Sequence, residues 1–162
     1  MGTCPALYDP ASGRVFVSNN SGVGVGVVDV KTARPLSGID VGGGAGNTQY
    51  DADSGHVLAA VHGLGALVDI DPITSEVAAR IALRGVRSCH GLLVASDLGL
   101  AFAACRGDVP TLAVVDPRAR RETMTPPLPT NIDVLAFDRR LQRLYAASET
   151  GTVAVFAVAA DR

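Results

Sequence analysis

The side chains that can carry chemistry in this sequence are two histidines and an aspartate, His62, His90 and Asp133. Imidazole and carboxylate groups are common ligands of zinc and related ions, so these three residues are candidate metal ligands. His90 and Asp133 are also the residue types of an acid–base pair. No close-spaced ligand pair such as H-x-H is present, so the three residues act together only if the fold brings them to one place.

Other motifs of catalysis or phosphate binding cannot be identified in the sequence. There is no recognisable Ser–His–Asp arrangement and no glycosidase-type pair of carboxylates. The glycine-rich run 42–46 is not a phosphate loop, because such loops lie between a strand and a helix N-terminus, whereas residues 47–52 have the pattern of another strand. We expect a flexible connection at this run and no cofactor.

The elements that must position these residues are short β-strands. Segments 90–95, 100–105 and 111–115 are apolar at consecutive positions, and turn-forming residues separate them at 96–99 and 106–110. Side chains of a strand point alternately to its two faces, so both faces of this small antiparallel sheet are apolar. Such a sheet must be covered on both sides by other sheets.

The same turn pattern recurs along the chain at intervals of roughly 40–45 residues, the length of one four-stranded propeller blade. The aligned columns are Tyr8, Tyr50, Val94 and Phe137; Asp9, Asp51, Ala95 and Asp138; and Gly13, Gly55, Gly99 and Gln142. A β-sandwich with accidental self-similarity is the alternative, and three concordant columns argue against it.

The sequence therefore predicts an all-β fold, a partial β-propeller of roughly 3.75 blades built from four-stranded antiparallel sheets. We expect a single domain over residues 1–162, with blades at about 6–46, 47–88, 89–130 and 131–162. In the first blade, the expected strands are 6–9, 14–18, 23–30 and 36–41. The recurring aspartates at the turns are expected to cap backbone amides.

Composition excludes several classes of protein. Hydrophobic residues make up 48% of the chain and charged residues 19%, which is typical of a globular protein. The net charge of −2 and the absence of tryptophan argue against nucleic-acid binding, which needs a basic face or stacking platforms. No apolar run reaches the roughly 20 residues of a membrane span. No signal peptide is recognisable in this chain, so the protein is either cytoplasmic or exported by a signal outside it.

The motifs YDPASGRVFVSN, YDADSGHVLAAV and CHGLLVASDLGLAFAACRG resemble the YVTN-type β-propeller repeat family, and the resemblance extends over nearly the whole chain. It implies a bacterial propeller, commonly seven-bladed and often exported to the periplasm or secreted. It also implies a binding scaffold rather than an enzyme, and it supplies no catalytic motif. Two residues depart from the repeat, since Gln142 replaces the turn glycine and Ala157 replaces a recurring aspartate.

In a propeller, the connections between blades and the turns between second and third strands lie on one rim around the central channel. We expect this rim to be the binding surface, with candidate ligand-binding residues Asn20, Asn47, His62, His90, Arg106, Asp108, Asn131 and Asp133. The first functional hypothesis is a non-catalytic module that binds a protein, peptide or small molecule there. The alternative is a metal-dependent hydrolase or lyase that uses His62, His90 and Asp133.

Two cysteines are expected to face each other. If strands 90–95 and 100–105 form a hairpin about turn 96–99, Cys89 and Cys105 lie nearly opposite, at a Cβ separation that a disulfide can bridge. In an exported protein we predict that they are bonded, whereas in a reducing cytosol they remain free thiols. Cys4 is left without a partner.

The first and last blades of an open arc each lack a neighbour. Their uncovered faces are expected to carry Val15, Val17, Val153, Val155 and Phe156. Several hundred Å² of exposed apolar surface is more than a soluble monomer normally shows. We therefore expect either that two copies form a homodimer that closes the ring, or that the chain is part of a longer propeller.

Overall fold

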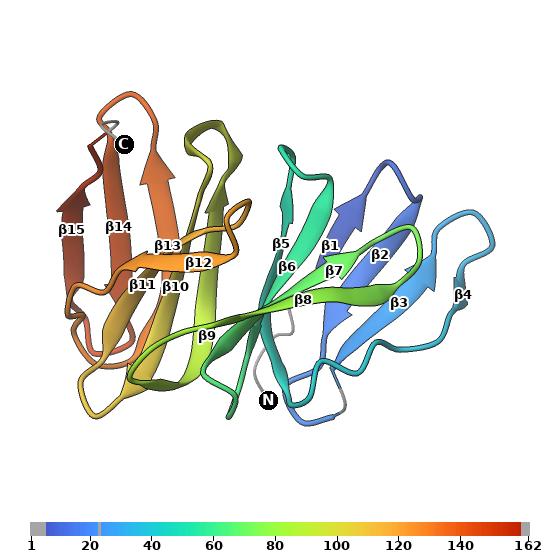
Figure 1. The fold of residues 1–162 in the computed structure, drawn as a ribbon, viewed down its shortest axis with the longest axis horizontal. Helices are drawn as coiled ribbons and strands as arrows, with labels where there is room; N and C mark the ends of the chain where they lie inside the picture. Colours follow the sequence, from blue (N-terminus) through green and yellow to red (C-terminus); the bar gives the residue numbers. More distant parts are fainter. Residues whose placement is uncertain (1–5, 23, 160–162) are drawn as a thin grey trace.

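The computed structural model describes residues 6–22 and 24–159, which form four antiparallel sheets (Figure 1). The first sheet contains β1 (Ala6–Asp9), β2 (Arg14–Ser18), β3 (Val25–Asp29) and β4 (Arg34–Pro35). The second contains β5 (Ala45–Asp51), β6 (His56–Val61), β7 (Ala66–Asp71) and β8 (Glu76–Ala82). The third contains β9 (Val86–Ala95), β10 (Leu100–Gly107), β11 (Thr111–Asp116) and β12 (Arg121–Met124). The fourth contains β13 (Ile132–Asp138), β14 (Arg143–Ser148) and β15 (Val153–Ala157).

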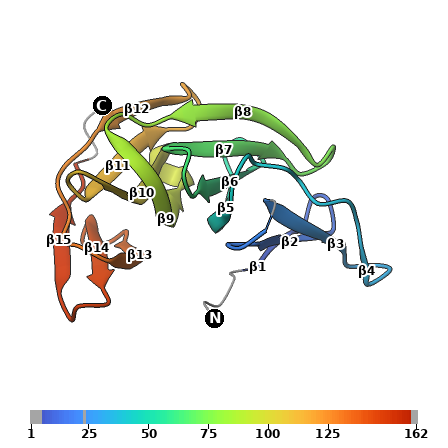
Figure 2. The same ribbon diagram turned by 90° about the horizontal axis from the view of Figure 1, so that it is seen from below.

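The four sheets are the blades of a partial β-propeller. Strands are hydrogen-bonded in chain order within each sheet, as a series of antiparallel hairpins requires. Figure 2 shows the sheets following one another round an arc, with β1, β5, β9 and β13 on its concave side. Strands β4, β8 and β12 lie on the convex side. The predicted all-β fold class is confirmed, and the one helical element in the described part of the chain is the short 3₁₀ turn η1 (Ser96–Leu98).

Two details of the predicted first sheet are wrong. The expected strand 36–41 does not form: β4 ends at Pro35, and Ile39 pairs with Val25 only in an isolated bridge. Proline has no N–H with which to extend the ladder. Beyond it, pairing continues only at single residues: the Leu36 amide donates to the Val27 carbonyl at 2.8 Å, and Ile39 exchanges two hydrogen bonds with Val25. The third strand begins at Val25 rather than at residue 23, which lies outside the described residues.

The core consists of three clusters, each between two neighbouring sheets. Leu58 and Leu67 of the second sheet pack toward the third, where they meet residues such as Leu92 and Ala103. Residues next to them in sequence, such as Val57 and Val68, pack instead toward Phe16 and Val27 of the first sheet. A third cluster, which includes Phe102, Leu112 and Leu144, lies between the third and fourth sheets. The consecutive apolar residues of the inner strands therefore fill two different clusters.

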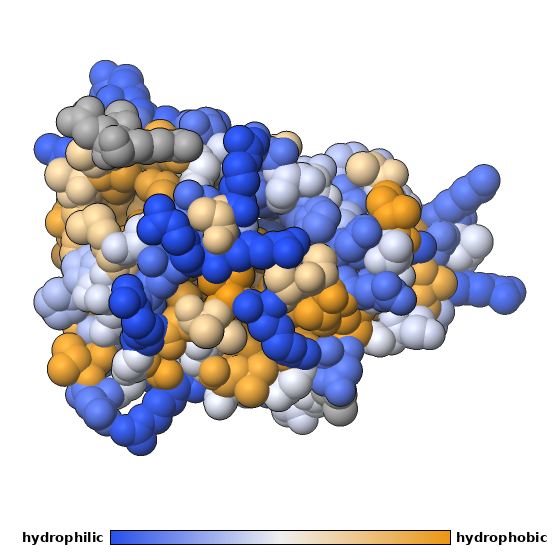
Figure 3. All heavy atoms as spheres, viewed as in Figure 1, coloured by the Kyte–Doolittle hydropathy of each residue, from blue (hydrophilic) through white to orange (hydrophobic). Residues whose placement is uncertain are grey.

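The outer strands are more polar. Along β8, the side chains alternate between exposed and more buried positions up to Ile81. Figure 3 shows charged side chains spread among apolar ones on the face that carries β8 and β12. Polar side chains also link the sheets: Arg84, in the connection after β8, binds Glu122 of β12 at 3.0 Å, and Arg120 contacts the buried Asp69 of β7 at 3.1 Å.

The recurring aspartates cap turns, as predicted. The carboxylate of Asp9 accepts hydrogen bonds from the backbone amides of Ala11 and Ser12 at 3.1 and 3.0 Å. Asp71 accepts equivalent bonds from the residues that follow it, and the bond from the Ile73 amide is the main cause of its lowered pKa. A lowered pKa stabilises the folded state above the ordinary carboxyl pKa, and this contribution is lost as the pH falls through the lowered value.

We predict that Asp9→Ala lowers the free energy of unfolding by about 1–3 kcal/mol, because Asp9 is fully buried and two backbone amides lose their acceptor. Asp9→Asn is the matched control, since its one carbonyl oxygen can keep one of the two bonds and the loss is expected to be smaller. Urea unfolding followed by tyrosine fluorescence measures both values. Equal losses in the two variants would contradict the capping role.

The described residues include no helix that is long and apolar enough to cross a lipid bilayer.

Candidate functional site

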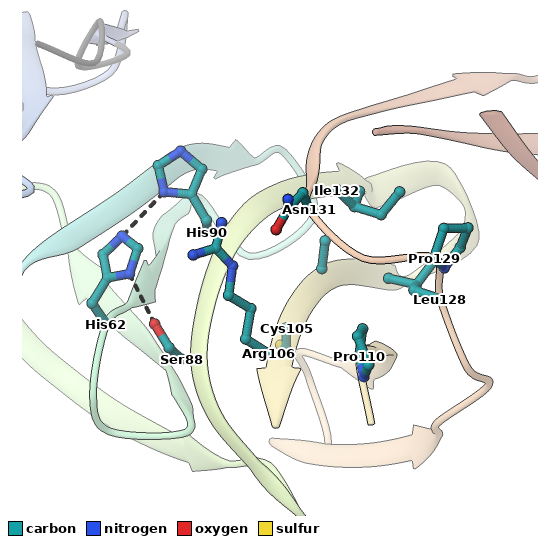
Figure 4. Close-up of a pocket in the computed structure, with 11 residues that line it drawn as sticks. His62, Ser88, His90, Cys105, Arg106, Pro110, Leu128, Pro129, Asn131 and Ile132 are labelled. Atoms are coloured by element: carbon teal, nitrogen blue, oxygen red, sulfur yellow. Dashed lines mark hydrogen bonds between the residues drawn. The ribbon is translucent and has the colours of Figure 1, made fainter. Parts of the chain in front are cut away.

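The predicted rim residues meet at a hollow where the second, third and fourth sheets come together (Figure 4). His62 follows β6, Ser88 and His90 lie on β9, Arg106 lies on β10, and Asn131 immediately precedes β13. The remaining wall is largely apolar and is formed by Ala104, Cys105, Pro110, Leu128, Pro129 and Ile132. The hollow is a shallow surface depression, and the space inside it together with the open solvent at its mouth measures about 310 Å³.

Two hydrogen bonds and one ion-pair contact link four polar side chains in a row. His62 contacts Ser88 Oγ through Nδ1 at 2.9 Å and His90 Nδ1 through Nε2 at 3.1 Å (Figure 4). The other ring nitrogen of His90, Nε2, lies 3.0 Å from Asp133 Oδ1. The chain Ser88–His62–His90–Asp133 therefore crosses three sheets, and each of its members is partly exposed.

The carboxylate of Asp133, at one end of this chain, determines which atom is the donor in each contact. A carboxylate only accepts, so we assign the Nε2 proton to His90, which leaves Nδ1 of the neutral ring as an acceptor. His62 then donates its Nε2 proton to that nitrogen and accepts the Ser88 hydroxyl proton at its own Nδ1. With both rings neutral, each of the two hydrogen bonds has one donor and one acceptor.

Burial lowers the pKa of His62, and the positive charges of His90 and Arg106 lower it further. His62 is therefore the poorer site for a positive charge. His90 Nε2, by contrast, lies 3.0 Å from a carboxylate oxygen of Asp133.

A β-bulge aims His90 at the hollow. Ala104 pairs with Gly91 and the next residue, Cys105, pairs with Cys89, so His90 is an extra residue on β9 with no partner on β10. Bulges bend a strand and redirect a side chain, and they are common beside functional sites. Beyond the bulge, Arg106 on β10 pairs with Ser88 on β9. The arginine therefore lies opposite the serine whose hydroxyl contacts His62.

Two glycines allow the three sheets to approach closely enough for the chain to form. A Cβ atom on Gly46 would lie 2.9 Å from both Cα and the carbonyl oxygen of His90. A Cβ atom on Gly91 would lie 3.0 Å from the carbonyl oxygen of Asp133. Any larger residue at these positions would push neighbouring sheets apart and separate His62, His90 and Asp133.

The structure brings together some of the predicted rim residues and not others. His62, His90, Arg106, Asn131 and Asp133 lie in or beside the hollow. Three others do not line it. Asn20 lies at the crossing between the first and second sheets, where its carbonyl oxygen packs against Gly44. Asn47 makes no side-chain contact with the chain of hydrogen bonds. Asp108 forms an ion pair with Arg87.

Sequence reasoning missed Ser88 and the apolar wall. Ser88 lies two positions before His90 on one strand, which is a signal that they share a face, although the bulge between them changes the local alternation. The wall depends on the path of the loop between β12 and β13, where Leu128 donates its backbone amide to Pro110 at 2.8 Å. That loop has no periodic pattern from which its path can be predicted.

The candidate metal ligands meet, but they do not converge on a common point. His90 lies in the middle, and its two nitrogens face His62 and Asp133 on opposite sides of the ring. Ligands of a metal ion instead direct their lone pairs at one centre. No group of three or more histidine, cysteine, aspartate or glutamate side chains suited to a metal occurs within residues 6–22 and 24–159.

A disulfide between two neighbouring strands supports the site. Cys89 and Cys105 are direct partners of β9 and β10, and their sulfur atoms are bonded at 2.04 Å. Cys89 lies between Ser88 and His90, and Cys105 precedes Arg106, so the bond holds the register of three site residues. Cys4 lies outside the described residues.

No protein-family model and no curated protein matches this sequence, so the resemblance to YVTN-type repeats is not confirmed. Solved structures share the fold. Hydrazine synthase of Kuenenia stuttgartiensis aligns with a TM-score of 0.80 at 16% identity, over 94% of this chain and 45% of that one. Dihydro-heme d1 dehydrogenase NirN, solved in complex with DHE, aligns with a TM-score of 0.70 at 13% identity, over 94% and 34%. The chain thus spans less than half the length of either, and at these identities the likeness establishes the β-propeller fold alone.

We predict that the Cys89–Cys105 bond forms if the protein is exported to an oxidising compartment. Mass spectrometry of unreduced, alkylated protein should then find one labelled thiol among the three cysteines, and three labelled thiols would contradict the bond. The double variant Cys89→Ala/Cys105→Ala should lose about 2–3 kcal/mol of stability, because the bond restricts the unfolded chain. Reduction of the wild-type protein is the control, because it removes the bond and keeps both cysteine side chains at their buried positions.

Proposed function

We propose that this chain is a non-catalytic β-propeller module that binds a ligand at the hollow lined by His62, His90, Arg106 and Asn131. The observation that carries the proposal is the meeting of polar side chains from three separate blades at one hollow with an apolar wall. A few convergent polar groups beside apolar side chains are the usual composition of a small-molecule site. Stacking of blades alone does not require such a group of side chains.

The family and the location belong to the same proposal. The repeated turn motifs support membership of the YVTN-type repeat family, with Gln142 and Ala157 as its departures. The cross-strand cysteine pair supports a periplasmic or secreted location, because such bonds persist in oxidising compartments.

The metal-dependent hydrolase or lyase is the less well supported function. Its ligands would have to leave their present hydrogen bonds, since both nitrogens of His90 are engaged. The unpaired positive charge of Arg106 beside His62 would also oppose a cation. Elemental analysis of the purified protein tests this alternative: one bound metal ion per chain, lost in His90→Ala, would favour it over a binding module.

We predict that small ligands raise the melting temperature of the protein through this hollow. The test is thermal unfolding with a panel of small aromatic compounds that differ in charge: benzoate, benzylamine and benzyl alcohol. Stabilisation by any of them should be reduced in Arg106→Gln or His90→Gln. Arg118→Gln is the matched control, because Arg118 is an exposed arginine that pairs with Asp53 away from the hollow. No stabilisation by any compound, or equal stabilisation in all variants, would contradict the proposed site.

The module also has two uncovered apolar faces, at the two ends of the arc (Figure 2). On the fourth sheet, the face turned away from the core carries Val134, Ala136, Tyr145, Ala147, Val153 and Val155. On the first sheet, the corresponding face carries Ala6, Tyr8, Val15, Val17 and Val28. Phe156 was also expected on an uncovered face, and this prediction is wrong. Phe156 pairs with Leu144, and its side chain packs against the cluster between the third and fourth sheets.

We propose that a second copy of the chain covers these faces. The described sheets follow one another round an open arc in Figure 2, and the face of the first sheet and that of the fourth are both apolar, as at the contacts between neighbouring blades. A two-fold arrangement would place the first sheet of each copy against the fourth sheet of the other and close a ring.

We predict a dimer in size-exclusion chromatography with light scattering. Val155→Asp should give a monomer, because Val155 is 54% exposed in the middle of the edge strand β15, on the fourth sheet's uncovered face, and a carboxylate there would be buried in the contact. Met124→Asp is the control, since Met124 is similarly exposed but lies on the convex side of the arc. A wild-type monomer would contradict the dimer and favour further blades from a longer polypeptide.

A further inference from the structure

The charges around the hollow leave it positive. Arg106 is exposed and lines the hollow, and its side chain has no hydrogen bond or ion pair with any other residue of the described chain. The amide side chain of Asn131 is likewise unpaired within the described residues. The one carboxylate in contact with the chain of hydrogen bonds, Asp133, binds the nitrogen of His90 that faces away from His62.

The other charged side chains on the neighbouring elements do not face the histidine pair. Arg87 of β9 and Asp108 of the β10–β11 turn form an ion pair with each other. Glu149, in the turn after β14, donates its backbone amide to the Asn131 carbonyl at 3.1 Å, and its side chain is exposed and does not line the hollow. The groups that face the histidine pair are therefore Arg106 and Asp133.

The histidine pair can accept one proton without breaking any contact. In the neutral state, protons lie on the hydroxyl of Ser88 and on Nε2 of each ring. An added proton at His62 Nδ1 would donate to Ser88 Oγ, and the proton at His62 Nε2 could pass to His90 Nδ1, which places the positive charge next to Asp133. A second added proton would place two N–H groups against each other across the 3.1 Å contact. The pair thus holds at most one extra charge.

We propose that the ligand of the hollow is a small organic carboxylate with an apolar body, and that its binding takes up one proton on the His62–His90 pair. This inference rests on the proposed binding function and adds the ligand class and its coupling to protons. An arginine guanidinium and a protonated imidazole both donate charge-assisted hydrogen bonds to a carboxylate. The wall of Pro110, Leu128 and Pro129 provides the apolar contact that an inorganic anion would not use.

The pH dependence follows from linkage. A bound carboxylate favours the charged form of the pair, so binding takes up a proton wherever the free pair is neutral. The affinity should then fall as the pH rises above the pKa of the pair, by up to about tenfold for each pH unit. Loss of Arg106 should weaken binding by about tenfold or more, because a charged donor is removed.

Isothermal titration of the wild-type protein with benzoate tests the inference. Titrations at about pH 6 and about pH 8, in buffers of different ionisation enthalpy, measure the number of protons taken up with each benzoate. We expect uptake of up to one proton at the higher pH and weaker binding there. In His90→Gln the uptake should disappear, whereas in Arg106→Gln affinity should fall while uptake remains.

Three results would overturn the inference. Benzoate binding without proton uptake, or with unchanged uptake in both His90→Gln and His62→Gln, would show that the pair does not titrate with the ligand. Equal affinity for benzyl alcohol would show that the carboxylate is not recognised. Inorganic phosphate that binds more tightly than benzoate would show that the apolar wall plays no part. In each case a binding module at this hollow remains supported, whereas the absence of binding by every compound of the thermal panel would instead contradict the proposed function.

Discussion

The structure depends on one constraint: a small sheet that is apolar on both faces must lie between two others. Neighbouring residues of β6 show this most clearly, since Leu58 packs toward the third sheet and Val57 toward the first. Such alternation makes each inner sheet unable to remain folded as a separate unit, because one of its faces would meet water. Stability is therefore shared between blades, and contacts between adjacent sheets fix the curvature of the arc.

The same constraint creates the site. Close stacking of three blades requires backbone approach at their concave edge, and Gly46 and Gly91 permit it. Once the backbones are this close, side chains at the ends of β6, β9 and the beginning of β13 lie within hydrogen-bond distance. The bulge at His90 then directs its imidazole ring between His62 and Asp133, whereas a regular strand would direct the ring elsewhere. Site geometry and core packing thus have one physical origin.

This dependence on packing explains which features of the fold and of the site could be predicted from the sequence. The blade fold was predictable because its signals are local: an aspartate such as Asp9 caps the turn that follows it, and apolar alternation marks each strand. The opposition of Cys89 and Cys105 also follows from one short hairpin. Pro35 was a local signal that was missed, and it marks the end of β4.

Features that depend on register across blades were not predictable in the same way. The inward orientation of Phe156 follows from its pairing with Leu144, and a shift by one residue would have exposed it. The approach of His62 to His90 depends on two sheets joined by residues 83–85 and on a bulge with no sequence signature. Candidate residues on the rim could be named as a set, but which of them meet is decided by packing.

The position of Asp133 decides the chemistry that the hollow can support. If this carboxylate pointed into the hollow beside Arg106, the two charges would neutralise each other and leave little preference for a charged ligand. It instead binds the far nitrogen of His90, so its negative charge supports a proton on the pair without occupying the guanidinium. Arg106 also lines the hollow and forms no ion pair with any described residue. Its guanidinium and the linked imidazoles therefore produce a site with a positive interior whose charge depends on pH.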